Sequence, residues 1–136
     1  MVDLAVEELG GSVAGAHVAV WGAAFKPNSD DIRDSPALDV ASTLQSRGAQ
    51  VVVYDPEAMA NARRIHPELT YADSAVAAAT GADLILHLTE WSEFVTLDPA
   101  ALDGVVRERR ILDGRNALDA DRWRASGWRY RALGRP

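Results

Sequence analysis

The chain has 136 residues, of which 48% are hydrophobic and 25% charged, and it carries a formal net charge of −6. This length and composition are typical of one globular domain, and the acidic balance without a block of basic residues argues against nucleic acid as a partner. The lack of cysteine excludes disulfides and thiolate chemistry within the chain, and without a long apolar run or a basic amino-terminal signal we expect a cytoplasmic protein that does not enter a membrane.

Strand and helix patterns alternate through the first half of the chain. A helix is expected over 35–48, because Ser35 suits the N-cap, Pro36 the first turn and Gly48 the position after the last turn. The segment 2–9 also has a helical pattern, but it has little to pack against unless another segment precedes it. The other expected elements are strand 17–22, strand 50–56, helix 57–65, strand 69–72 and helix 73–81.

The second half continues the alternation. Its expected elements are strand 83–89, helix 97–108, strand 109–114, helix 119–127 and strand 128–133. The arginines of the last strand favour a place at an edge of the sheet. Strands that alternate with helices predict an α/β fold of three layers. Right-handed crossovers then favour a doubly wound, mostly parallel six-stranded sheet in the order 3-2-1-4-5-6.

A doubly wound sheet binds its ligands beyond the carboxyl ends of the strands, where the first and fourth strands diverge. The segments that follow the first, fourth and fifth expected strands are 23–34, 89–94 and 113–119. We therefore expect these three segments to line one edge of the domain and to form its binding site.

The segment 23–34 contains two cations, Lys26 and Arg33, among several hydrogen-bonding side chains. One interpretation is a ligand cradle. Pro27 stiffens the backbone beside Lys26, and Arg33 lies just before a well-capped helix, where a phosphate gains from the guanidinium and the helix dipole. The other interpretation is a solvated loop whose aspartates cap the next helix and pair with these cations. The residues alone leave both interpretations open.

Arg115 and Trp91 follow the fifth and fourth expected strands. Gly114 allows a sharp turn that would present Arg115 to a ligand. From the residues alone, we favour an ordinary exposed turn arginine over this functional interpretation. Trp91 could stack on a base or a sugar, but a tryptophan near a strand end is more often a core residue.

The titratable residues near the strand ends do not complete a catalytic set. Asp55 takes the place of the ribose-binding carboxylate of dinucleotide-binding folds, but no G-x-G-x-x-G follows the first strand, so we favour a turn-capping role. His87 lies within an apolar strand and is expected to be a packed core residue. Glu90 and Glu93 are plausible acids without a partner histidine or serine. We therefore expect no catalytic residue and no metal site in this chain.

Four stretches together resemble a known family. They are GAAFKPNSDDIRDSPALDV, GAQVVVYDPEA, GADLILHLTEWSEF and ILDGRNALD. The first closely resembles the signature of the C-terminal domain of the UDP-glucose/GDP-mannose dehydrogenase family, with Ala23 in place of the usual leucine and Ser29 in place of the usual threonine. The resemblance covers residues 10–133, and TEWSEF is most similar to the UDP-glucose 6-dehydrogenase branch.

The resemblance implies an enzyme with an N-terminal Rossmann domain for NAD, a central helical region that dimerises, and a C-terminal Rossmann-like domain for the nucleotide sugar. On this pattern Phe25, Lys26 and Arg115 would contact the UDP-sugar, and Arg33 would reach the NAD. The family oxidises the sugar C6 from alcohol to acid in a four-electron reaction that uses two NAD and a cysteine. That cysteine would lie upstream, so the chain alone is expected to be inactive.

The resemblance also divides the chain. Residues 1–11 would be the end of a linker helix, and residues 12–136 the Rossmann-like UDP-sugar-binding domain. The expected function is the UDP-binding part of an NAD-dependent UDP-glucose 6-dehydrogenase, which makes UDP-glucuronate for polysaccharide biosynthesis. One alternative is a stand-alone, non-catalytic nucleotide-sugar-binding or assembly module. Another is the same domain of a GDP-mannose or UDP-N-acetylaminosugar dehydrogenase.

Overall fold

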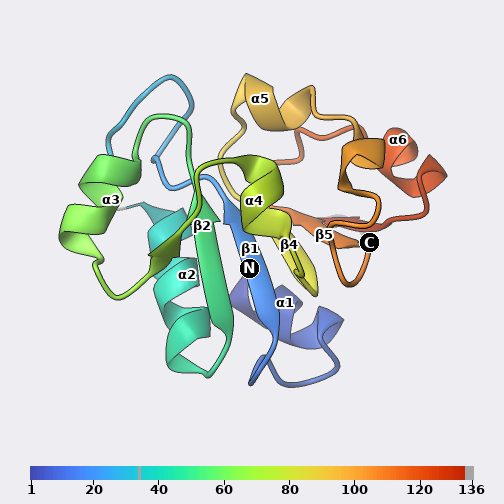
Figure 1. Cartoon of the computed structure of the whole chain (residues 1–136), viewed down its shortest axis with the longest axis horizontal. Helices are drawn as coiled ribbons and strands as arrows, with labels where there is room; N and C mark the ends of the chain where they lie inside the picture. Colours follow the sequence, from blue (N-terminus) through green and yellow to red (C-terminus); the bar gives the residue numbers. More distant parts are fainter. Residues whose placement is uncertain (34, 134–136) are drawn as a thin grey trace.

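The strands form one six-stranded sheet in the order β3-β2-β1-β4-β5-β6, and each neighbouring pair is parallel (Figure 1). The computed structural model describes residues 1–33 and 35–133. The strands are β1 (His17–Trp21), β2 (Gln50–Tyr54), β3 (Thr70–Tyr71), β4 (Leu84–His87), β5 (Arg110–Asp113) and β6 (Arg129–Ala132). This order confirms the predicted doubly wound fold, with β6 at an edge.

Helices cover both faces of the sheet, so the structure has three layers. Figure 1 shows α4 in front of the sheet and α1 behind it. The helices α1 (Val2–Glu8), α2 (Pro36–Ser46) and α3 (Met59–Ile65) lie on one side. The other side carries α4 (Ala75–Ala79), α5 (Ser92–Val95), the 3₁₀-helix η1 (Pro99–Leu102) and α6 (Ala120–Ala125). Right-handed crossovers between parallel strands produce this division.

The central strands and the best-capped helix follow directly from their residues. All four residues of β4 are buried, as in a parallel sheet covered on both faces. The α2 helix begins where its signals predict, because the Ser35 hydroxyl accepts a hydrogen bond from the Leu38 N–H and Pro36 occupies the first turn. Gly48, just after the helix, has a φ of 96°.

Aromatic side chains fill the core between the sheet and the layer that contains α4, α5 and α6. Phe94 stacks on Trp21 with ring centroids 5.3 Å apart, and Trp123 meets Trp21 edge-on at 6.2 Å. The Trp21 indole N–H donates to the Ala75 carbonyl oxygen of α4 at 3.1 Å. Trp21 therefore connects this helical layer to the sheet. Its stacked and edge-on ring contacts stabilise the packing beyond the burial of its apolar surface.

The prediction of a helix over 97–108 is wrong. Only Pro99–Leu102 is helical, as one 3₁₀ turn, and a further short helix lies before it at Ser92–Val95. Asp98 caps the 3₁₀ turn by accepting a hydrogen bond from the Ala100 N–H at 3.0 Å. Gly104, two residues after this turn, has a φ of 74° in the left-handed region, so the chain leaves the helical conformation there.

The expectation that the segment 2–9 has little to pack against is also wrong. Ala5 is fully buried, and the α1 helix contacts α2 and β5. The Glu8 side chain is only 3% exposed and forms ion pairs with Arg129 at 2.9 Å and Arg131 at 3.5 Å. The α1 helix is therefore held against the sheet by the burial of Ala5 and by the ion pairs of Glu8.

A close approach of the first and fourth strand ends predicts that Gly22→Ala destabilises the fold. A Cβ at Gly22 would lie 2.5 Å from the Thr89 hydroxyl oxygen, and φ is 110° there. We expect a loss of about 3 kcal/mol in the free energy of unfolding, measured by urea denaturation. The control is Gly81→Ala, where φ is 69° and no atom lies within 4 Å of the added Cβ. We expect it to cost only about 1 kcal/mol, and equal losses would contradict the steric explanation.

Candidate functional site

The segments that follow β1, β4 and β5 meet at the carboxyl edge of the sheet. The Arg115 side chain, which follows β5, joins them directly. Its Nε–H donates to the Leu88 carbonyl oxygen after β4 at 2.9 Å, and an Nη2–H donates to the Phe25 carbonyl oxygen after β1 at 2.7 Å. The convergence expected from the sequence is therefore present, and Arg115 does more than an exposed turn arginine would.

A buried carboxylate, Asp55, organises the start of this edge. Asp55 is 1% exposed and accepts five hydrogen bonds at the end of β2. The donors, at 2.8–3.0 Å, are the backbone N–H groups of Ala23, Ala24, Glu57 and Ala58 and the indole N–H of Trp91. These bonds confirm the turn-capping role of Asp55, and they hold the buried Trp91 as a core residue.

A second buried carboxylate, Asp113, plays the same part at the end of β5. Asp113 is fully buried and also accepts five hydrogen bonds. The donors are His87 Nδ1, the Tyr130 hydroxyl and the backbone N–H groups of Arg115, Ala117 and Leu118. Three bonds therefore shape the turn that presents Arg115. Sequence reasoning missed this role, although LDG after an apolar strand parallels YDP after β2.

The hydrogen bonds of Asp113 outweigh its burial. Burial alone raises the pKa of Asp113, but the bonds from His87 and the Leu118 N–H lower it to well below the usual value of an aspartate. His87 itself is fully buried, and its ring lies edge-on to Phe94 at 5.8 Å. The expectation of a packed core histidine is confirmed.

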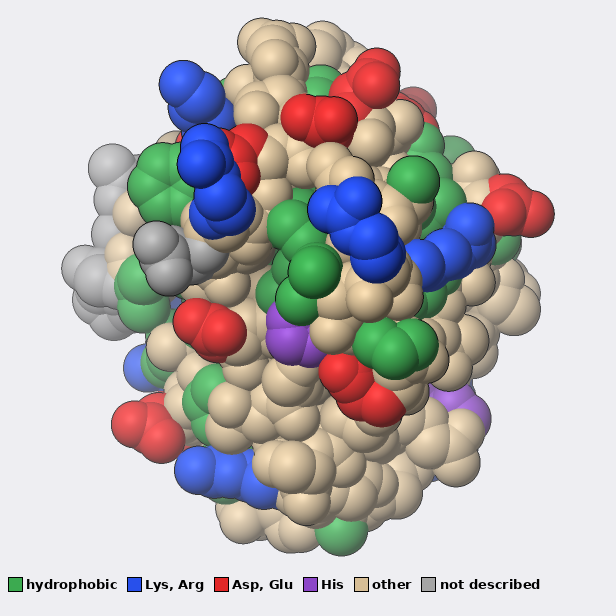
Figure 2. Space-filling model, turned by 90° about the vertical axis from the view of Figure 1, so that its left-hand side faces the viewer, with side chains coloured by type: hydrophobic (Ala, Val, Ile, Leu, Met, Phe, Trp, Pro, Cys, Tyr) green, Lys and Arg blue, Asp and Glu red, His purple; other side chains and the backbone are tan. Residues whose placement is uncertain are grey.

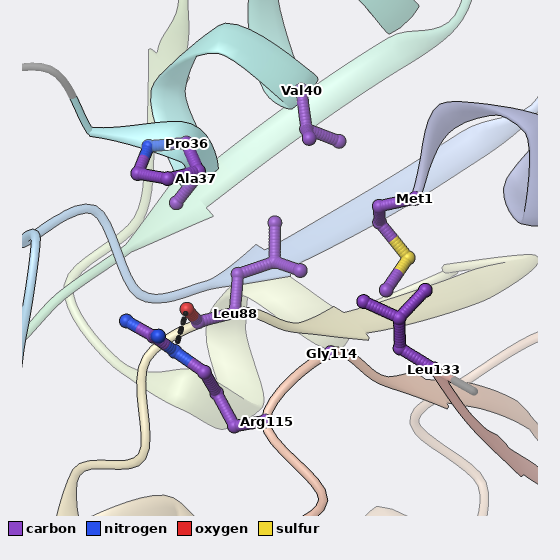
Figure 3. A pocket seen from close by; sticks show the side chains of 8 residues that line it. All are labelled: Met1, Pro36, Ala37, Val40, Leu88, Gly114, Arg115 and Leu133. Atoms are coloured by element: carbon purple, nitrogen blue, oxygen red, sulfur yellow. Dashed lines mark hydrogen bonds between the residues drawn. The ribbon is translucent and has the colours of Figure 1, made fainter. Parts of the chain in front are cut away.

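A small apolar cavity of about 120 Å³ lies beside Arg115 (Figure 3). Figure 3 shows side chains from several elements around one space, with Arg115 at its rim and the hydrogen bond to Leu88 drawn as a dashed line. The lining residues are Met1, Pro36, Ala37, Val40, Leu88, Gly114, Arg115 and Leu133. The edge of the sheet thus combines a fixed guanidinium with an apolar hollow.

The loop after β1 carries exposed side chains. Phe25 is 47% exposed and Lys26 is exposed as well. Arg33 forms a 2.9 Å ion pair with Asp31, whose pKa the Arg33 hydrogen bonds lower to about 2. Asp34, the last residue of this predicted segment, lies outside the described residues. Figure 2 shows the left-hand side of the molecule as it is drawn in Figure 1, and the Lys and Arg side chains on this side lie mainly in its upper half. The strands of Figure 1 have their carboxyl ends in the upper half as well.

The two glutamates after β4 have different partners. The Tyr54 hydroxyl donates to both carboxylate oxygens of Glu93, at 2.9 and 3.0 Å. The pKa of Tyr54 is raised to about 12, mainly by burial and secondly by this hydrogen bond. Glu90 lies near Arg115, with Oε2 3.7 Å from Nε. Neither arrangement places a nucleophile next to a base.

Among residues 1–33 and 35–133, no group of three or more His, Asp or Glu side chains could hold a metal ion. Within the same ranges, no helix has the length and apolar character needed to cross a membrane.

Comparison with known proteins identifies close relatives of most of the chain. The profile described as "UDP-glucose/GDP-mannose dehydrogenase family, UDP binding domain" matches residues 19–120. A UDP-glucose 6-dehydrogenase of Rhizobium meliloti (strain 1021) is 43% identical over 127 residues, which are 93% of this chain and 29% of that protein. The chain thus spans about three tenths of the length of this relative.

Solved structures agree in fold. A UDP-glucose dehydrogenase from Pyrobaculum islandicum has a TM-score of 0.79 at 34% identity, over 97% of this chain and 28% of that one. An NDP-N-acetyl-D-galactosaminuronic acid dehydrogenase from Methanosarcina mazei has a TM-score of 0.82 at 29% identity, over 98% of this chain and 28% of that one. Both share the doubly wound domain.

The lowered pKa of Asp113 predicts an acid-sensitive fold. Since the unfolded carboxyl has a pKa of about 3.9, its contribution to stability is complete above roughly pH 5 and is lost as the pH falls below about 4. Asp113→Asn should lose this dependence and cost about 3 kcal/mol at pH 7, because an amide cannot accept all five hydrogen bonds.

Urea unfolding at several pH values between 7 and 3 measures both effects. The control is Asp103→Asn, which removes an exposed carboxylate. An Asp113→Asn protein with the acid dependence of the unmodified chain would contradict this account.

Proposed function

The chain belongs to the UDP-glucose/GDP-mannose dehydrogenase family, and we propose that it is the UDP-binding part of an NAD-dependent UDP-glucose 6-dehydrogenase. The Rhizobium meliloti relative, at 43% identity, is named for UDP-glucose. Among the solved structures, the UDP-glucose dehydrogenase of Pyrobaculum islandicum is 34% identical to the chain, and the Methanosarcina mazei dehydrogenase, which is named for an N-acetylated sugar, is 29% identical. This ranking supports UDP-glucose over those sugars, while the UDP moiety is the part that the domain would recognise in either case.

The geometry of Arg115 carries the proposal. An arginine has five N–H donors, and Arg115 uses two for the carbonyl oxygens of Leu88 and Phe25. Five less two leaves three donors on a guanidinium whose position is already fixed. A fixed fork of this kind suits the oxygens of a diphosphate. Lys26, next to Phe25 in the chain, would add a second positive charge to the same edge.

The loop after β1 does not fit the cradle of a dinucleotide. A pyrophosphate cradle uses free backbone N–H groups after the first strand, but those of Ala23 and Ala24 both donate to Asp55. The glycine at position 22 serves the close approach of Thr89. We therefore propose that NAD, which accepts hydride from the sugar, binds mainly to another domain of the same enzyme, and that Arg33 reaches it from the rim.

The proposed enzyme has three parts. Residues 1–11 would be the end of a linker helix from a central dimerising region, and residues 12–136 the UDP-sugar-binding domain, of which 134–136 lie outside the described residues. The oxidation would take place in the cytoplasm, without nucleic acid or membrane as a partner. Phe25, Lys26 and Arg115 would position the UDP-sugar against the NAD domain, and the thiol would come from outside these 136 residues, which contain no cysteine.

Titration of the 136-residue chain with UDP tests the binding site. We expect amide resonances of residues 25–33 and 113–118 to shift. Lys26→Ala and Arg115→Ala should each weaken binding by about 1.5–3 kcal/mol, as measured by calorimetry, because each removes charge-assisted hydrogen bonds. The control is Arg109→Ala, which removes a cation from the opposite, amino-terminal edge of β5. If this control weakened UDP binding as much, the loss would reflect overall charge and the proposed site would be wrong.

The chain alone should not oxidise UDP-glucose. When the 136-residue protein is incubated with UDP-glucose and NAD, we expect no increase in absorbance from NADH, because the chain contains no cysteine to form the thiohemiacetal. The Rhizobium meliloti relative serves as the positive control under the same conditions. NADH formation by the purified chain would overturn the assignment of a binding role.

A further inference from the structure

The fixed guanidinium of Arg115 faces a carboxylate of its own chain. Glu90 Oε2 lies 3.7 Å from Arg115 Nε, and the two side chains are 33% and 32% exposed. Both side chains are therefore partly open to solvent. The diphosphate of the proposed ligand would have to approach the same guanidinium.

The contact between Glu90 and Arg115 differs from the other contacts of this arginine. The Nε–H already donates to the Leu88 carbonyl oxygen at 2.9 Å, and 3.7 Å is too long for a hydrogen bond to Glu90. The attraction is thus purely electrostatic, and its loss breaks no hydrogen bond. The bonds to Leu88 and Phe25 would keep the guanidinium in place after Glu90 moves away.

The residues on both sides of Glu90 are anchored by their side chains. The hydroxyl of Thr89, which is fully buried, donates to the Ala24 carbonyl oxygen at 2.9 Å. The indole of Trp91 donates to Asp55 at 3.0 Å. Glu90 lies between these two fixed residues, and only its side chain is free to leave the guanidinium.

We propose that Glu90 is an internal counter-ion that competes with anionic ligands for Arg115 and thereby sets the phosphate affinity of the site. This inference rests on the proposed function. The chain carries a net charge of −6, and a carboxylate beside Arg115 offsets one of the few local positive charges. Glu90 therefore lowers the affinity for a diphosphate alone, and selects ligands whose nucleoside adds contacts elsewhere.

Comparison of Glu90→Gln with Glu93→Gln tests this competition. Both variants remove one negative charge, but Glu93 is bonded to the Tyr54 hydroxyl and not to Arg115. The probes are UDP, inorganic pyrophosphate and uridine, titrated into the 136-residue chain by calorimetry at two salt concentrations. We expect Glu90→Gln to bind UDP and pyrophosphate about threefold to fivefold more tightly, in the range of exposed ion pairs, with uridine unchanged. The gain should shrink at high salt, and Glu93→Gln should change affinity less than twofold.

The outcomes separate this inference from the proposed function. If UDP binds equally to Glu90→Gln and the unmodified chain, the counter-ion role is wrong and the UDP site stands. If pyrophosphate alone binds, and binds more tightly to Glu90→Gln, the counter-ion role stands and nucleotide recognition is wrong. A variant that binds either anion more weakly would show that Glu90 holds the loop, which overturns the inference. Failure of both anions to bind overturns both proposals.

Discussion

The carboxyl edge of the sheet depends on the burial of two carboxylates, Asp55 and Asp113. A buried carboxylate is costly unless its oxygens are met by donors, and each of these accepts five hydrogen bonds. They follow β2 and β5, which occupy equivalent places in the two halves of a doubly wound sheet. Most of the donors are backbone N–H groups of the adjoining loops, so the hydrogen bonds that stabilise the two buried carboxylates also fix the conformation of these loops.

This constraint decides how the edge can bind an anion. A phosphate cradle would use the N–H groups of Ala23 and Ala24, but both already donate hydrogen bonds to Asp55. Phosphate recognition must then come from side chains, which suits Arg115 and the exposed Lys26. Asp113 accepts a hydrogen bond from the backbone N–H of Arg115 and so helps to position the Arg115 side chain. Asp55 thus occupies backbone donors after β1, whereas Asp113 positions a side-chain donor after β5.

Local signals predict much of this arrangement from the sequence. Ser35 and Pro36 mark the start of α2, and the strand pattern gives the sheet order with its convergent loops. What sequence reasoning missed depends on contacts between distant residues. The residues alone favour an ordinary turn arginine at position 115, whereas the family resemblance predicts that Arg115 contacts the UDP-sugar. Neither predicts the hydrogen bonds that its side chain donates to the carbonyl oxygens of Phe25 and Leu88, because these residues follow other strands. The role of Asp113 requires His87 from a neighbouring strand, and no periodicity within β5 predicts that pairing.

The α1 helix shows how edge charges and the site are connected. The arginines of β6 fit an edge strand, and in the fold Arg129 and Arg131 pair with the nearly buried Glu8. An ion pair that removes a carboxylate from solvent is costly to break from one side, so α1 is held against the strands by more than apolar contact. Met1, at the start of this helix, lines the cavity beside Arg115. The ion pairs at β6 therefore help to fix one wall of the hollow next to the proposed phosphate site, and the position of α1 is part of the geometry that a ligand would meet.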